Sequence, residues 1–158
     1  MRPVSVKHAY DFDGVLAEGP PPNEVAWGKM NGSMRAERKM SLLDHYASAA
    51  PIYDPPEKIF WVISARKEEP EIRAISERWL RIRFGGRAQA LFLLKGSRTT
   101  ENVIRYKSLT IAEEGFTDFT EDNLQVVRGV ARILPSCRVW LFKDGAPSRW
   151  PPVVASSS

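Results

Sequence analysis

The sequence predicts an α/β fold in which helices cover both faces of a parallel sheet. Five short apolar runs indicate strands, and most of them lack apolar-polar alternation, as expected where a sheet is buried on both faces. Helical patterns lie between the runs, and this alternation favours right-handed βαβ units. The chain has 158 residues, of which 43% are hydrophobic, and this suits one domain with its own core. We therefore expect a doubly wound, five-stranded parallel sheet.

The expected strands differ in the strength of their signal. The clearest are the apolar runs IFWVI (59–63) and ALFLL (90–94). The fourth in chain order is the weakest because Asp118 interrupts it. All five expected strands are Val4–Tyr10, Ile59–Ile63, Ala90–Leu94, Phe116–Thr120 and Arg138–Phe142.

Three expected helices lie between the later strands. The first begins at Pro70, where proline suits the first helical turn, and ends at Gly85. The second covers about 102–114 and stops at a glycine. The third begins at Asn123 and ends near Leu134. The first and the third have apolar residues on one face, as a helix packed on a sheet requires.

The connection between the first two strands is unusually long. It contains an expected helix over 33–49 and two proline clusters. A connection of this length in a compact domain is usually a functional insert. We predict a single domain over 1–146, a small helical insert over about 17–57, and an irregular tail over 147–158.

Composition limits the classes of protein that fit. No apolar run approaches the ~20 residues of a membrane-spanning helix, and the first residues lack the apolar core of a signal peptide. We therefore expect a cytoplasmic protein with no membrane partner. The single cysteine, Cys137, cannot form an internal disulfide. A net charge of +4 permits a polyanionic partner without requiring one, and the oligomeric state stays open.

Charged and polar residues follow the expected strands. The carboxyl ends of parallel strands meet at one edge of a sheet, where ligands bind. Several carboxylates placed together repel one another unless a cation lies among them, and hard oxygen ligands suit Mg²⁺. We therefore expect Mg²⁺ at this edge. The residues concerned are Asp11, Asp13, Ser64, Arg66, Glu121 and Asp122.

Four short motifs occur in order along the chain. They are DFDGVL (11–16), VISAR (62–66), YKS (106–108) and TEDN (120–123). Together they resemble the motifs of the haloacid dehalogenase-like (HAD) hydrolase superfamily, in its phosphatase branch. The resemblance covers about residues 4–145 and implies a Rossmann-like, HAD-like sheet with an insert after the first strand.

The resemblance also implies an activity and roles for individual residues. It implies a Mg²⁺-dependent phosphomonoesterase in which Asp11 is the nucleophile and forms an aspartyl-phosphate. Asp13 would act as general acid and base. Ser64 and Lys107 would contact the phosphoryl group and complete the catalytic set. Asp11, the backbone carbonyl of Asp13, and Asp122 would bind the metal.

Further residues are expected around this set. Ser64, Ala65, Arg66 and Lys107 are the expected substrate-binding residues. Arg66 is included because the chain is loosely similar to polynucleotide kinase-phosphatases and RNA-repair-like HAD proteins. Glu121, Asp118 and Asn123 are candidates for supporting the metal ligands.

Two assignments within the motifs have competitors. Lys95, directly after the third strand, competes with Lys107 for the role of motif lysine. Asp118 competes with Glu121 as the acidic partner of Asp122, and the choice depends on where the fourth strand ends. We favour Lys107 and Glu121.

The four motifs define the chemistry of the site more closely than they define the substrate or the class of activity. A small insert favours an open site, so a nucleotide or a nucleic-acid terminal phosphate is the preferred phosphomonoester substrate. Trp27 could stack on a base, or it could pack inside the insert together with Leu42. Two alternative functions are a non-catalytic binding or regulatory module and a phosphotransferase.

Overall fold

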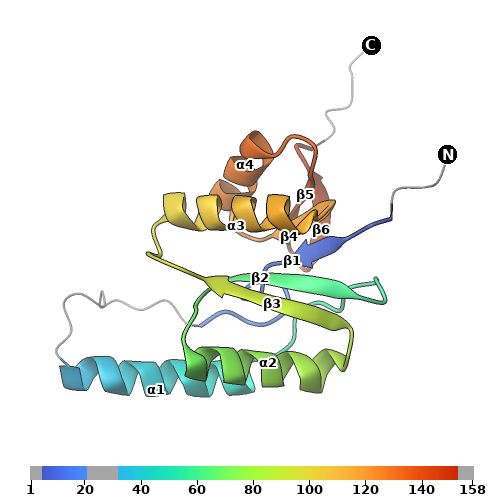
Figure 1. Cartoon of the computed structure of the whole chain (residues 1–158). Coiled ribbons are helices and arrows are strands. Elements are labelled where there is room, and N and C mark those ends of the chain that lie inside the picture. The colour runs from blue at the N-terminus through green and yellow to red at the C-terminus, as the bar shows by residue number, and fades with distance from the viewer. Residues whose placement is uncertain (1–4, 21–31, 153–158) are drawn as a thin grey trace, which may run out of the picture.

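Six strands form one sheet in the order β3-β2-β1-β4-β5-β6 (Figure 1). The computed structural model describes residues 5–20 and 32–152. The first five strands are parallel, and β6 pairs antiparallel with β5 at one edge. The strands are β1 (His8–Tyr10), β2 (Phe60–Lys67), β3 (Ala88–Leu94), β4 (Asp118–Glu121), β5 (Arg138–Lys143) and β6 (Ala146–Trp150).

Helices cover both faces of this sheet. On one face α1 and α2 lie side by side, and on the other face lie α3 and α4 (Figure 1). This confirms the expected α/β class. No helix in the described part of the chain is long and apolar enough to cross a membrane. The helices are α1 (Gly32–Ser48), α2 (Pro70–Phe84), α3 (Thr100–Glu114) and α4 (Leu124–Ile133).

The short central strand β1 separates two apolar cores. Tyr10 faces the core shared with α1 and α2, which also contains Phe60 and Trp79. Ala9 faces the opposite core, which α3 and α4 close with residues such as Val103 and Val127. Because neighbouring residues of a strand point to opposite faces, three buried residues suffice to anchor both layers.

The direction of winding changes beside β1. The chain passes from β1 to β2 and β3 on one side, and then returns to place β4 and β5 on the other side. The pairing of β1 with β4 continues past the end of the strand, because the Asp11 amide donates to the Thr120 carbonyl at 2.9 Å. Such a switch point is where an open α/β sheet binds ligands.

The predicted number of strands was too low by one. Residues 147–150, assigned to an irregular tail, lie in β6, and residues 153–158 lie outside the described part. The turn between β5 and β6 is the two-residue Asp144-Gly145 loop, in which both residues have positive φ, 53° and 81°. This dipeptide is a strong hairpin signal, and Pro147 is tolerated because β6 is an edge strand.

The insert after β1 extends the helical layer on one face of the sheet. Its helix α1 packs against α2, and the Trp79 indole donates to the Ala49 carbonyl at 2.9 Å. Leu42 and Tyr46 of α1 are buried in the core beneath. The predicted helix over 33–49 is therefore confirmed, and Leu42 packs inside the fold. Trp27 lies outside the described residues.

Candidate active site

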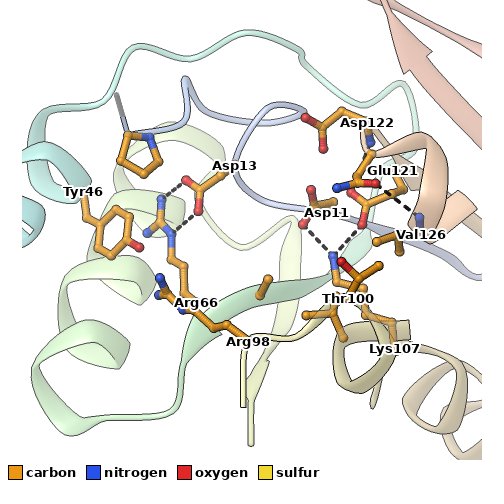
Figure 2. A pocket seen from close by; sticks show the side chains of 14 residues that line it. Asp11, Asp13, Tyr46, Arg66, Arg98, Thr100, Lys107, Glu121, Asp122 and Val126 are labelled. Carbon is orange, nitrogen blue, oxygen red and sulfur yellow. Dashed lines mark hydrogen bonds and ion pairs between the residues drawn. The ribbon is translucent and has the colours of Figure 1, made fainter. Parts of the chain in front are cut away.

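A cleft of about 340 Å³ lies at the carboxyl ends of β1 and β4 (Figure 2). Side chains from both halves of the sheet and from both helical layers contribute to it. Seven of the lining residues are acidic or basic: Asp11, Asp13, Arg66, Arg98, Lys107, Glu121 and Asp122. The charged residues that the motifs predicted at this edge do converge here.

Lys107 connects the ends of two strands inside the cleft. Its Nζ lies 2.8 Å from Asp11 Oδ1 and 2.8 Å from Glu121 Oε1. All three residues are buried, with Lys107 only 1% exposed. Helix α3 supplies the lysine, and β4 supplies the glutamate. By contrast, Lys95 is exposed and is not among the residues that line the cleft, so the structure favours Lys107.

The two carboxylates hold the ammonium group in its charged form. Burial by itself would lower the pKa of Lys107, but the charges of Asp11 and Glu121 raise it above its usual value. Burial raises the pKa of Asp11 well above its usual value, and the nearby charge of Glu121 adds to this rise. The site therefore disfavours the negative charge of ionised Asp11 unless a further cation balances it.

Asp122 adds a third carboxylate to the same end of the cleft. One oxygen from each of Asp11, Glu121 and Asp122 lies within 4.8 Å of the other two. Partial burial and the charge of Asp11 raise the pKa of Asp122 to about 7. Crowding of this kind is relieved when a divalent cation binds among the oxygens.

The oxygens differ in how they are already engaged. Glu121 Oε1 contacts Lys107, and its Oε2 accepts the Asp122 amide at 3.1 Å. Asp11 and Asp122 are therefore the carboxylates best placed to bind Mg²⁺, with Glu121 fixing their surroundings. Hard carboxylate oxygens are the donor set that Mg²⁺ prefers, so the residues fit the expected cofactor.

Gly14 allows Asp122 to approach the loop that follows β1. A Cβ atom at Gly14 would lie 2.1 Å from Asp122 Oδ2, which is too close for any side chain. Gly14 also has a φ of 85°, a conformation that favours glycine. The loop is closed by its own backbone, since the Leu16 amide donates to the Phe12 carbonyl at 2.9 Å. The presence of glycine at this position of the first motif is thus explained by the steric conflict that a side chain would have with Asp122.

Asp13 points toward Arg66 and not toward Asp11 (Figure 2). Arg66 Nε donates to Asp13 Oδ2 at 2.9 Å, and its Nη2 donates to Oδ1 at 2.7 Å. The guanidinium lies 3.7 Å from the ring centres of both Phe12 and Tyr46, and its third nitrogen donates to the Ser76 hydroxyl. The buried Arg66 side chain therefore holds the Asp13 carboxylate in place and links the insert helix to the sheet.

The strand that carries the second motif is longer than predicted. β2 continues through Lys67, so Ser64, Ala65 and Arg66 lie within it, beside an irregularity in the β2–β3 register. Ala65 and Arg66 line the cleft. Ser64 is fully buried, is not among the lining residues, and its hydroxyl accepts the Arg66 amide at 3.0 Å.

Asp118 lies at the opposite end of β4 from the cleft, so its expected role beside the metal ligands was wrong. It accepts two hydrogen bonds from Arg138 and one from Trp140. The strand ends at Glu121, which settles the register in favour of the Glu121-Asp122 pair. Asn123 lines the cleft and caps α4 by accepting the Gln125 and Val126 amides.

Six lining residues were not predicted, and three of these have polar or charged side chains: Tyr46, Arg98 and Thr100. Arg98 could have been found, because it follows β3 at the same edge of the sheet as the other polar residues. Tyr46 carried no signal, since the sequence does not reveal which residue of the insert helix reaches the cleft.

No protein-family model matches this chain, and no curated protein is significantly similar to it in sequence.

Proposed function

We propose that this protein is a Mg²⁺-dependent phosphomonoesterase of the HAD type that forms an aspartyl-phosphate on Asp11. The observation that carries the proposal is the buried lysine that joins Asp11 to Glu121, next to Asp122, at the switch point of the sheet. The order of the four motifs supports the same reading.

In the proposed reaction, a carboxylate oxygen of Asp11 attacks phosphorus, and the bond from phosphorus to the leaving oxygen breaks. Lys107 keeps Asp11 in place and offsets negative charge that develops on the phosphoryl oxygens. Bound Mg²⁺, held by Asp11 and Asp122, would supply further positive charge next to the phosphoryl group. Water then attacks the aspartyl-phosphate, which releases phosphate and restores Asp11.

Asp13 is the proposed proton donor to the leaving oxygen and the base for the attacking water. Both oxygens of its carboxylate accept N–H groups of Arg66 in the described conformation. Asp13 therefore has to exchange at least one of these contacts for the leaving group when it donates a proton. Arg66 thus supports catalysis by positioning Asp13, while direct binding of substrate by Arg66 stays a prediction.

Phosphate release in the presence and absence of Mg²⁺ tests this function. The substrates are an aryl phosphate, a panel of nucleotides, and oligonucleotides with 5′- or 3′-phosphate. Asp11→Asn is expected to reduce release by about a thousandfold or more, because it removes the nucleophile. Asp144→Asn is the matched control, since Asp144 is exposed in the β5–β6 turn and asparagine tolerates its positive φ.

The outcomes separate the alternatives. Release that requires Mg²⁺ and Asp11 supports the proposal, and the best substrate identifies the substrate class. Transfer of phosphate to an added alcohol in preference to water would indicate a phosphotransferase. No release by the wild-type protein, together with no binding of Mg²⁺, would favour the non-catalytic module.

A further inference from the structure

Three basic side chains line the cleft, and two of them are engaged by carboxylates. Arg66 forms an ion pair with Asp13, and Lys107 lies between Asp11 and Glu121. Both cations are buried within the protein, with side chains no more than 1% exposed. Their charge is therefore already balanced before any ligand enters.

Arg98 differs from the other two cations. It is exposed, and in the described part of the chain it forms no ion pair with any carboxylate. Figure 2 shows its side chain extending toward Tyr46, whereas Lys107 reaches Asp11 from the other side of the cleft. Burial raises the pKa of the Tyr46 hydroxyl, and the positive charge of Arg98 acts against that rise.

The loop that presents Arg98 is held by several hydrogen bonds. The Asn102 side chain donates to the Ser97 carbonyl at 2.6 Å and to the Lys95 carbonyl at 3.3 Å. Thr99 caps α3 by accepting the Asn102 amide. Gly96, with a φ of 93°, makes the turn. These bonds fix the backbone from which Arg98 extends, so less of the loop has to be ordered when a ligand binds.

The cleft is consequently divided into two electrostatic regions. Around Asp11 and Asp122 the excess charge is negative and suits a metal ion. Around Arg98 and Tyr46 the charge is positive and unbalanced, because Arg66 and Asp13 neutralise each other there. A ligand that fills both regions needs one phosphate for the metal region and another anionic group for Arg98.

We infer that Arg98 binds a second phosphate group of the substrate, so that the substrate class is a phosphomonoester that carries a further phosphate. This inference rests on the proposed function, because it places the cleaved phosphate beside Asp11. Arginine suits the role, since its planar N–H groups can bind two phosphate oxygens at once. Tyr46 is only 2% exposed and Arg66 covers one face of its ring, so recognition here depends on charge and hydrogen bonds and not on stacking.

The test compares substrates that differ in the second phosphate. Hydrolysis of a nucleoside 5′-monophosphate is measured beside that of the 3′,5′-bisphosphate and of a 5′-phosphorylated dinucleotide, for wild type and Arg98→Gln. The variant is expected to reduce the preference for the two substrates with a second phosphate, as a ratio of kcat/KM, by roughly ten- to a hundredfold. Lys95→Gln removes an equal charge from the same loop and is expected to keep the wild-type ratio.

A binding measurement makes the test independent of turnover. Calorimetry with Asp11→Asn and Mg²⁺ measures the affinity for the nucleoside bisphosphate, and addition of Arg98→Gln is expected to weaken it by roughly tenfold or more.

Equal affinity with and without Arg98, or an unchanged kcat/KM ratio, overturns the inference. Loss of affinity in a protein whose wild type hydrolyses no phosphomonoester would overturn the proposed function while supporting the role of Arg98. If Lys95→Gln caused the same loss as Arg98→Gln, the effect would come from the overall positive charge of the loop. That result would also overturn the inference.

Discussion

The two ends of β4 hold acidic side chains in opposite electrostatic environments. At its start, Asp118 accepts hydrogen bonds from Arg138, Trp140 and Thr117. Burial by itself would raise the pKa of Asp118, but these donors lower it to about 2. Just past its end, partial burial and the charge of Asp11 raise the pKa of Asp122 to about 7. Asp118, at the start of this short strand, therefore has enough hydrogen-bond donors to stabilise its negative charge, whereas Asp122, just past its end, has too few.

The contrast indicates which end of the strand has a structural role and which has a functional one. A buried carboxylate that serves the fold is expected to be paired and fully hydrogen-bonded. A cluster that lacks the positive charge it requires is typical of a site that binds a cation or a reacting group.

The largest effect is expected from Lys107→Met. The substitution leaves Asp11 and Glu121 buried without a cation, and it should lower the free energy of unfolding by about 3–5 kcal/mol. Urea unfolding at pH 7 measures the change, and Lys95→Met, on an exposed loop, is the control. Adding Glu121→Gln to Lys107→Met should recover part of the loss. Equal stability of Lys107→Met and the control would contradict the ion-pair network.

Asp118→Asn should have the next largest effect on stability. The amide cannot accept all the hydrogen bonds that Arg138 and Trp140 donate, so the expected loss is about 1–3 kcal/mol. Because the folded pKa lies below the unfolded one, the stabilisation by ionised Asp118 is present above about pH 4 and is lost as the pH falls toward 2. Unfolding curves from pH 2 to 7 should therefore converge for the two proteins at the acid end.

The regular elements of the fold could be predicted because their signals are local. The apolar runs of β2 and β3 and the helix that begins at Pro70 are readable from short windows of sequence. β6 was missed because it is an edge strand with little apolar content, although the Asp144-Gly145 turn that precedes it was a readable signal.

The site could be predicted only as far as its motifs extend. The convergence of Asp11, Lys107 and Asp122 followed from motif order and from the common edge of parallel strands. The Arg66–Asp13 pair joins residues 53 positions apart and depends on rotamers that the sequence does not specify. The contact of Tyr46 with Arg66 depends on how the insert packs, and no local pattern of residues indicates that packing.

Gly14→Ala tests the close approach of Asp122 to the loop after β1. Gly115→Ala is a matched control, because both glycines have positive φ, 85° and 71°, but a Cβ at Gly115 meets nothing within 4 Å. The control should cost about 1 kcal/mol of stability through backbone strain alone. Gly14→Ala should add a steric effect of about 1 kcal/mol and should weaken binding of Mg²⁺ by displacing Asp122. Equal Mg²⁺ affinity of the two variants would show that this contact does not position the carboxylate.

The smallest expected effect is a pH dependence that Asp122 imposes on the metal-free protein. Its folded pKa of about 7 lies above the unfolded value, so the folded state binds the extra proton between about pH 4 and pH 7. Stability should therefore decrease as the pH rises through this range. Because the carboxylate is partly exposed to solvent, the decrease should amount to no more than about 1 kcal/mol.

Asp122→Asn isolates this contribution, because the remaining titratable groups are common to both proteins. The variant should equal the wild type near pH 4 and be slightly more stable near pH 8 when Mg²⁺ is absent. Saturating Mg²⁺ should reverse the order at pH 8, since only the wild type gains the full energy of binding. A variant less stable than wild type at pH 8 without Mg²⁺ would mean that Asp122 already has the partners that Asp118 has. The two ends of β4 would then not differ in the way that assigns the active site to one of them.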